Sequence, residues 1–218
     1  MLAANSSPAA LHAAIIAAAR AKQSVHYVSA SNDGTSQITI KADAGRSEGI
    51  QQVAFRKGGK TGHATVIVAG KTAYLRGDSF TLVSFIGLPS PGAAKYANVW
   101  IRIPSTSSAY APIAAAVTLG SALDEIGPQN KTTAIRTTVD GQKLIGVRGT
   151  YTRQKKVYTD TIFARAANPP LPTEETVVGP KFQAVNAFSK WNEKISISIP
   201  KKTVAIANVL AVKTGPSA

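Results

Sequence analysis

The stretch that decides the fold covers residues 79–123 and reads SFTLVSFIGLPSPGAAKYANVWIRIPSTSSAYAPIAAAVTLGSAL. Only Lys95 and Arg102 carry charge in it, and it contains no acidic residue. Such a composition, between two polar and strand-like flanks, predicts burial. Its prolines and glycines divide it into pieces shorter than the roughly 20 uninterrupted apolar residues that a bilayer-spanning helix needs. We therefore expect a core insert or a cavity lining, not a membrane anchor.

A helix followed by short strands is expected before this insert. The alanine-rich residues 5–23 predict the helix, with Ser7 as its N-cap and Pro8 in the first turn. From Val25 onward the apolar period changes from 3.6 to 2, and tight turns such as Asn32-Asp33-Gly34 separate the runs. The predicted strands cover residues 25–28, 37–41, 49–56, 64–68 and 72–75.

The insert and the sequence after it predict the remaining helices and strands. A helix capped by Asp78 or Ser79 is expected through Leu88, then a strand, then a helical region broken near Gly120. After Gly127-Pro128 the period returns to 2. The expected segments are a strand at 99–103, helical residues from 107 or 108 to 126, and strands at 132–139, 144–152, 157–164, 176–178, 182–188 and 195–199.

This order predicts one α+β domain, because no polar linker divides the two meanders and the segment between them is the most apolar in the chain. The simplest solution is a curved antiparallel sheet, a half-barrel, with helices packed on its concave face. We expect a single domain over residues 1–218, with flexible ends at 1–6 and 212–218.

Charge is the other strong compositional signal. Lys and Arg number 25 against 11 Asp and Glu, which gives a net charge of +14 and a pI near 10.1. Two interpretations stay open: a polyanionic neighbour, such as acidic lipid head groups, anionic envelope polymer or nucleic acid, or general solubility. The absence of cysteine excludes disulfides, thiolate metal sites and cysteine nucleophiles. No signal segment opens the chain, so we expect any export signal to have been removed.

Motifs for catalysis are weak. Residues 54–61, AFRKGGKT, fit a relaxed phosphate-loop pattern, but strand sequence follows where a helix should begin, so a basic hairpin turn is expected. His12, His26 and His63 lack metal-ligand spacing, and the acidic pair Glu174-Glu175 points to opposite faces if it lies on a strand. No enzyme, cofactor or metal site is predicted. Basic turns with few aromatic residues also argue against nucleic acid as a partner.

Three segments resemble one family. They are residues 22–29, KQSVHYVS, after the alanine-rich helix; 98–104, NVWIRIP, before the apolar helices; and 188–200, FSKWNEKISISIP, which resembles a closing strand. With the order of elements, they resemble the LolA-like superfamily, specifically the actinobacterial LppX/LprG-type lipoproteins. The resemblance implies a half-barrel whose helices cover a hydrophobic cavity for acyl chains, in proteins that carry lipids or lipoglycans outside the cytoplasmic membrane. The lipobox cysteine of that family is not present where Asn5 stands, so anchoring is not predicted for this chain.

The sequence therefore predicts a non-catalytic, extracytoplasmic lipid or lipoglycan carrier of the envelope or secreted space. The alternative is an envelope scaffold that uses its basic surface on anionic polymer or a protein partner. The residues expected to line the acyl cavity could equally form a dry core, and only a space too large for side chains distinguishes the two. They are Val53, Phe55, Val66, Val68, Tyr74, Phe80, Leu82, Val83, Ile86, Trp100, Ile113, Val117 and Leu123.

Overall fold

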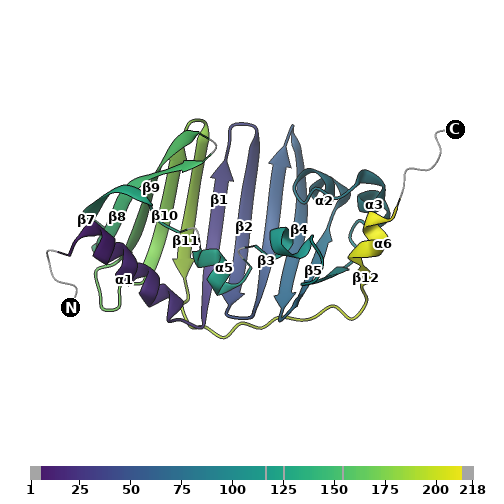
Figure 1. Ribbon diagram of the computed structural model, residues 1–218, viewed down its shortest axis with the longest axis horizontal. Coiled ribbons are helices and arrows are strands. Elements are labelled where there is room, and N and C mark those ends of the chain that lie inside the picture. Colours follow the sequence, from purple (N-terminus) through teal and green to yellow (C-terminus); the bar gives the residue numbers. More distant parts are fainter. Residues whose placement is uncertain (1–5, 116, 125, 154, 213–218) are drawn as a thin grey trace.

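The computed structural model describes residues 6–115, 117–124, 126–153 and 155–212. It contains one large open sheet with helices on one of its faces (Figure 1). The helices are α1 (Pro8–Arg20), α2 (Ser79–Ser84), α3 (Ser90–Lys95), α4 (Tyr110–Ala114), α5 (Leu119–Leu123) and α6 (Ile206–Leu210). The strands are β1 (Ser24–Asn32), β2 (Ser36–Gly45), β3 (Glu48–Lys57), β4 (Lys60–Ala69), β5 (Thr72–Gly77), β6 (Ile101–Pro104), β7 (Asn130–Val139), β8 (Gln142–Arg153), β9 (Lys156–Arg165), β10 (Pro172–Gly179), β11 (Phe182–Ser189) and β12 (Val204–Ala205).

The two predicted meanders form a single sheet. Its strand order is β12-β6-β5-β4-β3-β2-β1-β11-β10-β9-β8-β7, and β1 joins the halves by pairing antiparallel with β11, with Tyr27 opposite Phe188. The predicted α+β half-barrel with helices on one face is confirmed. One detail of the prediction is wrong, because the edge strand β12 pairs parallel to β6.

This strand order explains the apolar insert. The first meander ends with β6 near one edge of the sheet, and the second begins with β7 at the other edge. The chain between them must therefore cross the covered face of the sheet (Figure 1). The crossing is close: a Cβ added to Gly49 on β3 would clash with the carbonyl of Val117. A segment that covers a sheet face in this way must be apolar, because its side chains are removed from water.

The turns follow their sequence signals. The phosphate-loop-like residues 54–61 form the predicted hairpin, in which Lys57 pairs with Lys60 across a turn that holds Gly58 and Gly59 at φ +56° and +74°. These backbone conformations favour glycine, which has no Cβ. No helix begins after the turn, so the geometry of a phosphate loop is not present here.

The helices of the insert differ from the prediction. α2 is capped by Asp78 as expected but ends at Ser84 instead of Leu88, and the unexpected helix α3 lies where Pro91 and Gly92 predict a break. Pro91 instead lies in the first turn of α3, where its missing N–H costs nothing. The helical region expected from residue 107 or 108 to 126, broken near Gly120, forms two short helices, α4 and α5. The break lies between Ala114 and Leu119, just before the expected position, and Gly120 itself lies inside α5.

The predicted closing strand at residues 195–199 is also wrong. This segment pairs with no described strand and runs along the lower edge of the sheet in Figure 1, from β11 to the short strand β12. Its start is held to the beginning of β1, because Asn192 N–H donates to the carbonyl of Ser24 and Ser24 Oγ donates to the carbonyl of Glu193. The alternating pattern predicts an extended chain, but it does not show whether a neighbouring strand edge is free. The ends predicted to be flexible, 1–6 and 212–218, lie almost entirely outside the described residues.

Asp78 offers a test of how the insert is attached to the sheet. Its carboxylate accepts hydrogen bonds from the N–H groups of Thr81 in α2 and His63 in β4. Replacing it with alanine leaves both donors without this partner. We expect Asp78→Ala to lower the free energy of unfolding by about 1–3 kcal/mol in urea titrations. The exposed Glu174→Ala should have little effect, and equal stability of both variants would contradict this role of Asp78.

Candidate functional site

A hollow of about 830 Å³ lies between the sheet and the crossing segment. Its floor is formed by β1, β2 and β8–β11, and residues of α4, α5 and the chain up to residue 129 cover it. The lining is partly apolar and partly polar. It comprises Tyr27, Ser29, Ser31, Ile40, Ala111, Ala115, Ser121, Ala122, Asp124, Ile126, Gly127, Gln129, Tyr151, Thr152, Arg153, Asp160, Glu175, Val177, Phe182, Ala184, Asn186 and Phe188.

None of the predicted cavity residues lines this hollow. Most of them pack together in the other half of the molecule, in a cluster under α2, α3, α4 and α6 that contains Val53, Val66, Val68, Leu82, Ile113 and Val117, with Val83 and Ile86 against it. Phe55 stacks on Phe80 at 5.7 Å between ring centroids. Leu123 lies in a separate hydrophobic cluster, which also contains buried residues of α1.

Two predicted residues lie apart from these groups. Tyr74 is half-buried and alternates along β5 with the buried Ala73 and Leu75, which places it on the opposite face of the sheet. Trp100 is half-buried, and its carbonyl accepts a hydrogen bond from the N–H of Val204. Contact of these residues and of the packed cluster with a lipid stays a prediction.

Two carboxyl groups form the polar wall of the hollow. Asp160 on β9 is opposite Val177 on β10, and Glu175 lies two residues from Val177, so the two carboxyls are diagonal neighbours on the same face. Both are almost completely buried, with 1% and 3% of their surface exposed. Glu175 accepts hydrogen bonds of 2.7 Å from Gly127 N–H and from Asn186 Nδ2. Asp160 Oδ1 is buried with no hydrogen-bond partner among the described residues.

Burial decides the ionisation of this pair. Removal from water and, to a smaller extent, the nearby Glu175 carboxylate together raise the pKa of Asp160 to about 8. Burial also raises the pKa of Glu175, while its two hydrogen bonds oppose that rise. At neutral pH the wall therefore holds at least one protonated carboxyl group, which can both donate and accept a hydrogen bond.

Aromatic side chains lie at two places along the floor. Tyr151 stacks on Tyr158 at 5.0 Å, and Phe182 meets Tyr158 edge-on at 5.7 Å. Elsewhere Tyr27 lies beside Phe188 at 6.4 Å, and its hydroxyl accepts a 2.6 Å hydrogen bond from Gln51 Nε2. Burial raises the pKa of Tyr27 to about 12, so this hydroxyl remains neutral.

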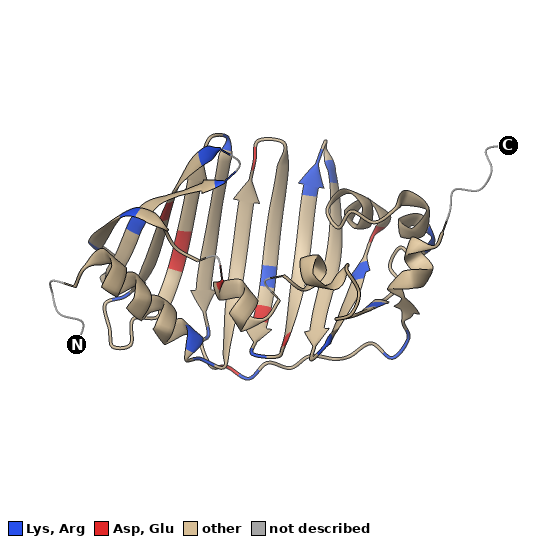
Figure 2. Cartoon of the chain, in the orientation of Figure 1, with Lys and Arg blue, Asp and Glu red and all other residues tan. Residues whose placement is uncertain are grey.

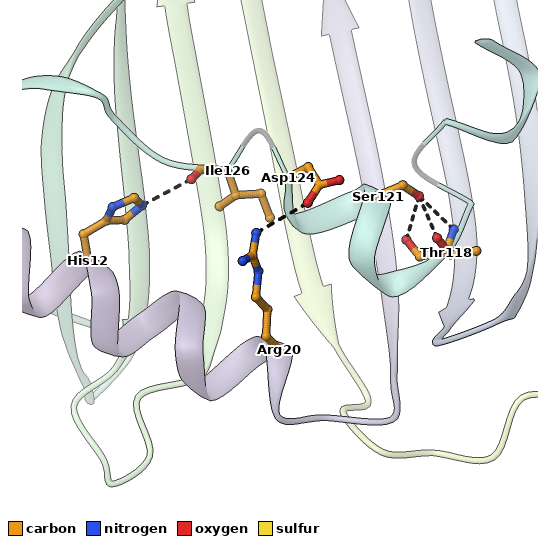
Figure 3. A network of polar contacts seen from close by, with 6 residues as sticks. All are labelled: His12, Arg20, Thr118, Ser121, Asp124 and Ile126. Atoms are coloured by element: carbon orange, nitrogen blue, oxygen red, sulfur yellow. Dashed lines mark hydrogen bonds and ion pairs between the residues drawn. The ribbon is translucent and has the colours of Figure 1, made fainter. Parts of the chain in front are cut away.

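The cover of the hollow is tied to α1 (Figure 3). His12 Nε2 lies 3.2 Å from the carbonyl of Ile126, and Arg20 pairs with Asp124 at 3.4 Å. At the other end of α5, the hydroxyls of Thr118 and Ser121 form a capping box. α1 therefore holds the C-terminal side of the cover, whereas the capping box is internal to α5. The Arg20 pair is exposed to solvent and contributes little to stability.

Sequence reasoning missed the buried acids, although a signal existed. Asp160 is in phase with the apolar residues Ile162 and Ala164, and Glu175 is in phase with Val177. The prediction that Glu174 and Glu175 point to opposite faces is confirmed, because Glu174 is exposed and Glu175 buried.

His26 has an acidic partner that its local sequence does not show, since Nδ1 lies 2.8 Å from Asp43 Oδ1 on the neighbouring strand. In the part of the chain that the structure describes, no three His, Cys, Asp or Glu residues are grouped as metal ligands would be.

The pH dependence of stability tests the burial of Asp160. A carboxyl whose folded pKa is raised from 3.8 to about 8 contributes its full stability at pH below 3.8 and loses it as pH rises through 8. We expect Asp160→Asn to be more stable than the wild type at pH 9 by several kcal/mol, with an upper bound of roughly 6 kcal/mol at about 1.4 kcal/mol per pKa unit. The two should differ much less at pH 4. Denaturant unfolding across this range measures the difference, Glu174→Gln is the control, and parallel curves for wild type and Asp160→Asn would contradict the shift.

Comparison with known proteins adds the following. No protein-family model matches the chain, and the search of curated proteins gave no match. Two solved structures match at probability 1.00: LprF from Mycobacterium bovis, with a TM-score of 0.54 over 87% of this chain and 95% of LprF, and the lipoprotein LppX from Mycobacterium tuberculosis, with a TM-score of 0.53 over 88% of this chain and 98% of LppX. Sequence identity is 14% in both cases. Within the described residues no helix has the length and apolar character needed to cross a membrane. The resemblance seen in the sequence is thus matched by the structure: the chain has the fold of the LppX and LprF lipoproteins.

Proposed function

We propose that this protein is a non-catalytic lipid-binding carrier that works outside the cytoplasmic membrane and holds acyl chains in the hollow between β1, β2, β8–β11 and the crossing segment. The observation that carries the proposal is this hollow of about 830 Å³ in a fold shared with the lipoprotein LppX. Its volume is within the range of roughly 300–1,000 Å³ that ligand pockets occupy.

The lining suits an amphiphile better than a wholly apolar ligand. Ile126, Val177, Ala184 and Phe188 offer apolar surface, and each methylene group buried there gains about 0.8 kcal/mol. Polar side chains on the same walls provide hydrogen bonds for a head group or ester linkage. A lipid or lipoglycan has both kinds of surface.

The basic surface supports a second part of the proposal, delivery at a membrane or at anionic envelope polymer. The chain carries a net charge of +14, and many of its Lys and Arg residues lie at strand ends and turns (Figure 2). Such charges attract anionic lipid head groups at low and moderate salt. An envelope scaffold that binds anionic polymer without a lipid would use the same surface, and it would bind with steep salt dependence and no dependence on acyl length.

Filling the hollow tests the carrier directly. Ala184 lines the hollow from β11, whereas Ala187 on the same strand is exposed on the other face. We expect Ala184→Trp to reduce uptake of a fluorescent phospholipid from vesicles by at least about tenfold, since the indole occupies the volume that an acyl chain needs. Ala187→Trp should take up lipid like the wild type.

Native mass spectrometry of the purified wild type provides the second measurement. Lipid that co-purifies with the wild type and with Ala187→Trp, but not with Ala184→Trp, is the expected result. Absence of co-purified lipid together with absence of uptake by the wild type would overturn the carrier. Equal uptake by all three proteins would show that acyl chains bind elsewhere.

A further inference from the structure

Asp160 holds an unused hydrogen-bond acceptor in the wall of the hollow. Its side chain is almost fully buried, it lines the hollow, and Oδ1 has no partner among the described residues. Glu175, its diagonal neighbour, differs in this respect, because its two oxygens accept from Gly127 and Asn186. A buried acceptor without a partner is destabilising and is rare in folded proteins. Because Asp160 lines the hollow, a donor on a molecule bound there would satisfy this oxygen.

The charge of the hollow indicates what kind of donor this is. Among the described residues, three with carboxyl groups, Asp124, Asp160 and Glu175, line it against one cationic side chain, Arg153. Figure 2 shows acidic residues on β9 and β10 in a chain whose net charge is +14. Asp124 is paired outside the hollow with Arg20, so its charge is partly compensated there. The hollow therefore holds more carboxyl residues than cationic ones although the surface of the protein is basic. Once ionised, Asp160 would attract a cationic head group and repel an anionic one.

We propose that the hollow recognises an amphiphile with a protonated amine, whose N–H donates to Asp160 Oδ1 while its alkyl chain lies along Val177, Ala184 and Phe188. This inference rests on the proposed function, because it assigns the polar end of the same lipid site. A charge-assisted hydrogen bond of an ammonium group to a carboxylate is stronger than a neutral one, most of all where water is excluded.

The ionisation of the site follows from its neighbours. Glu175 on β10, Tyr151 and Arg153 on β8, and Asp124 next to α5 are the titratable or charged groups that share the hollow with Asp160. Without a ligand, burial and Glu175 favour the protonated form of Asp160. A bound ammonium group favours the ionised form, so binding releases a proton from Asp160. Affinity for the amine should therefore rise as the pH rises from 6 toward 8.

Three probes with the same alkyl chain separate the possible head groups: decylamine, decanol and decanoate, measured by isothermal titration calorimetry with the full chain at pH 7. We expect decylamine to bind at least about tenfold more tightly than decanoate, and decanol to lie between them. Asp160→Asn should weaken decylamine binding about tenfold and leave decanol within about threefold of the wild type, since only the amine needs the carboxylate charge. Glu174→Gln, which removes an exposed carboxylate from the other face of β10, is the matched control and should bind all three probes like the wild type.

The possible outcomes distinguish failure of the amine site from failure of the lipid carrier. If the wild type binds decylamine and decanoate equally, or if Asp160→Asn binds decylamine as tightly as the wild type, the amine site is overturned while the lipid carrier stands. If none of the probes binds and vesicle lipid is not taken up, the carrier itself is overturned and the amine site with it. The wild-type comparison of the three probes needs no variant, so it decides the head-group preference even if Asp160→Asn does not fold.

Discussion

The structure depends on one topological constraint: the chain leaves the sheet near one edge, at β6, and must re-enter it at the opposite edge, at β7. Both meanders start or end at the centre, where β1 and β11 pair, and they extend outward from there. In the part of the chain that the structure describes, the connection from β6 to β7 lies across one face of the sheet. A backbone that crosses a sheet face loses water on that side, so it needs short helices that satisfy its own N–H and C=O groups and side chains that tolerate burial. The uncharged composition of residues 103–123 follows from this path.

The two halves of the sheet are covered differently. Over β3–β6 the insert brings α2, α3 and α4 together, α6 joins them from the C-terminal end, and their aliphatic side chains form a continuous packed cluster. Contact there is close enough that a Cβ on Gly92 would clash with the carbonyl of Val209. Over the other half α1, the short α5 and the chain that follows it cover the sheet, with Ala111 of α4 at the margin, and small side chains such as Ala122 and Ala184 line the space between them. The hollow thus lies where fewer helices cover the sheet and the side chains between the layers are small.

Buried carboxyl residues line the hollow in a chain whose net charge is +14. A basic surface and an acidic interior coexist because surface charges remain hydrated, whereas Asp160 and Glu175 are held by their strand register in a place where water is scarce. Glu175 also joins the cover to the floor, since its carboxylate accepts from Gly127 next to α5 and from Asn186 on β11. The polar wall is therefore part of the architecture of the hollow.

Much of the fold could be predicted from local sequence, because hairpin turns, strand alternation and helix caps are decided within a few residues. The half-barrel, the hairpin at residues 54–61 and the Asp78 cap are of this kind. The exact ends of α2, α4 and α5, the missing partner of residues 195–199 and the parallel pairing of β12 could not be settled locally, since they depend on which sheet edge is free and how much room lies above the face. Burial of residues such as Val53 and Leu82 was predictable from their apolar runs, but whether an apolar surface meets another side chain or an empty space is a property of packing. The sequence by itself determined that an uncharged segment covers a curved sheet; only the tertiary structure decided that the space lies under α5, and that Asp160 and Glu175 face it, because strands β9 and β10, the cover and α1 meet there from distant parts of the chain.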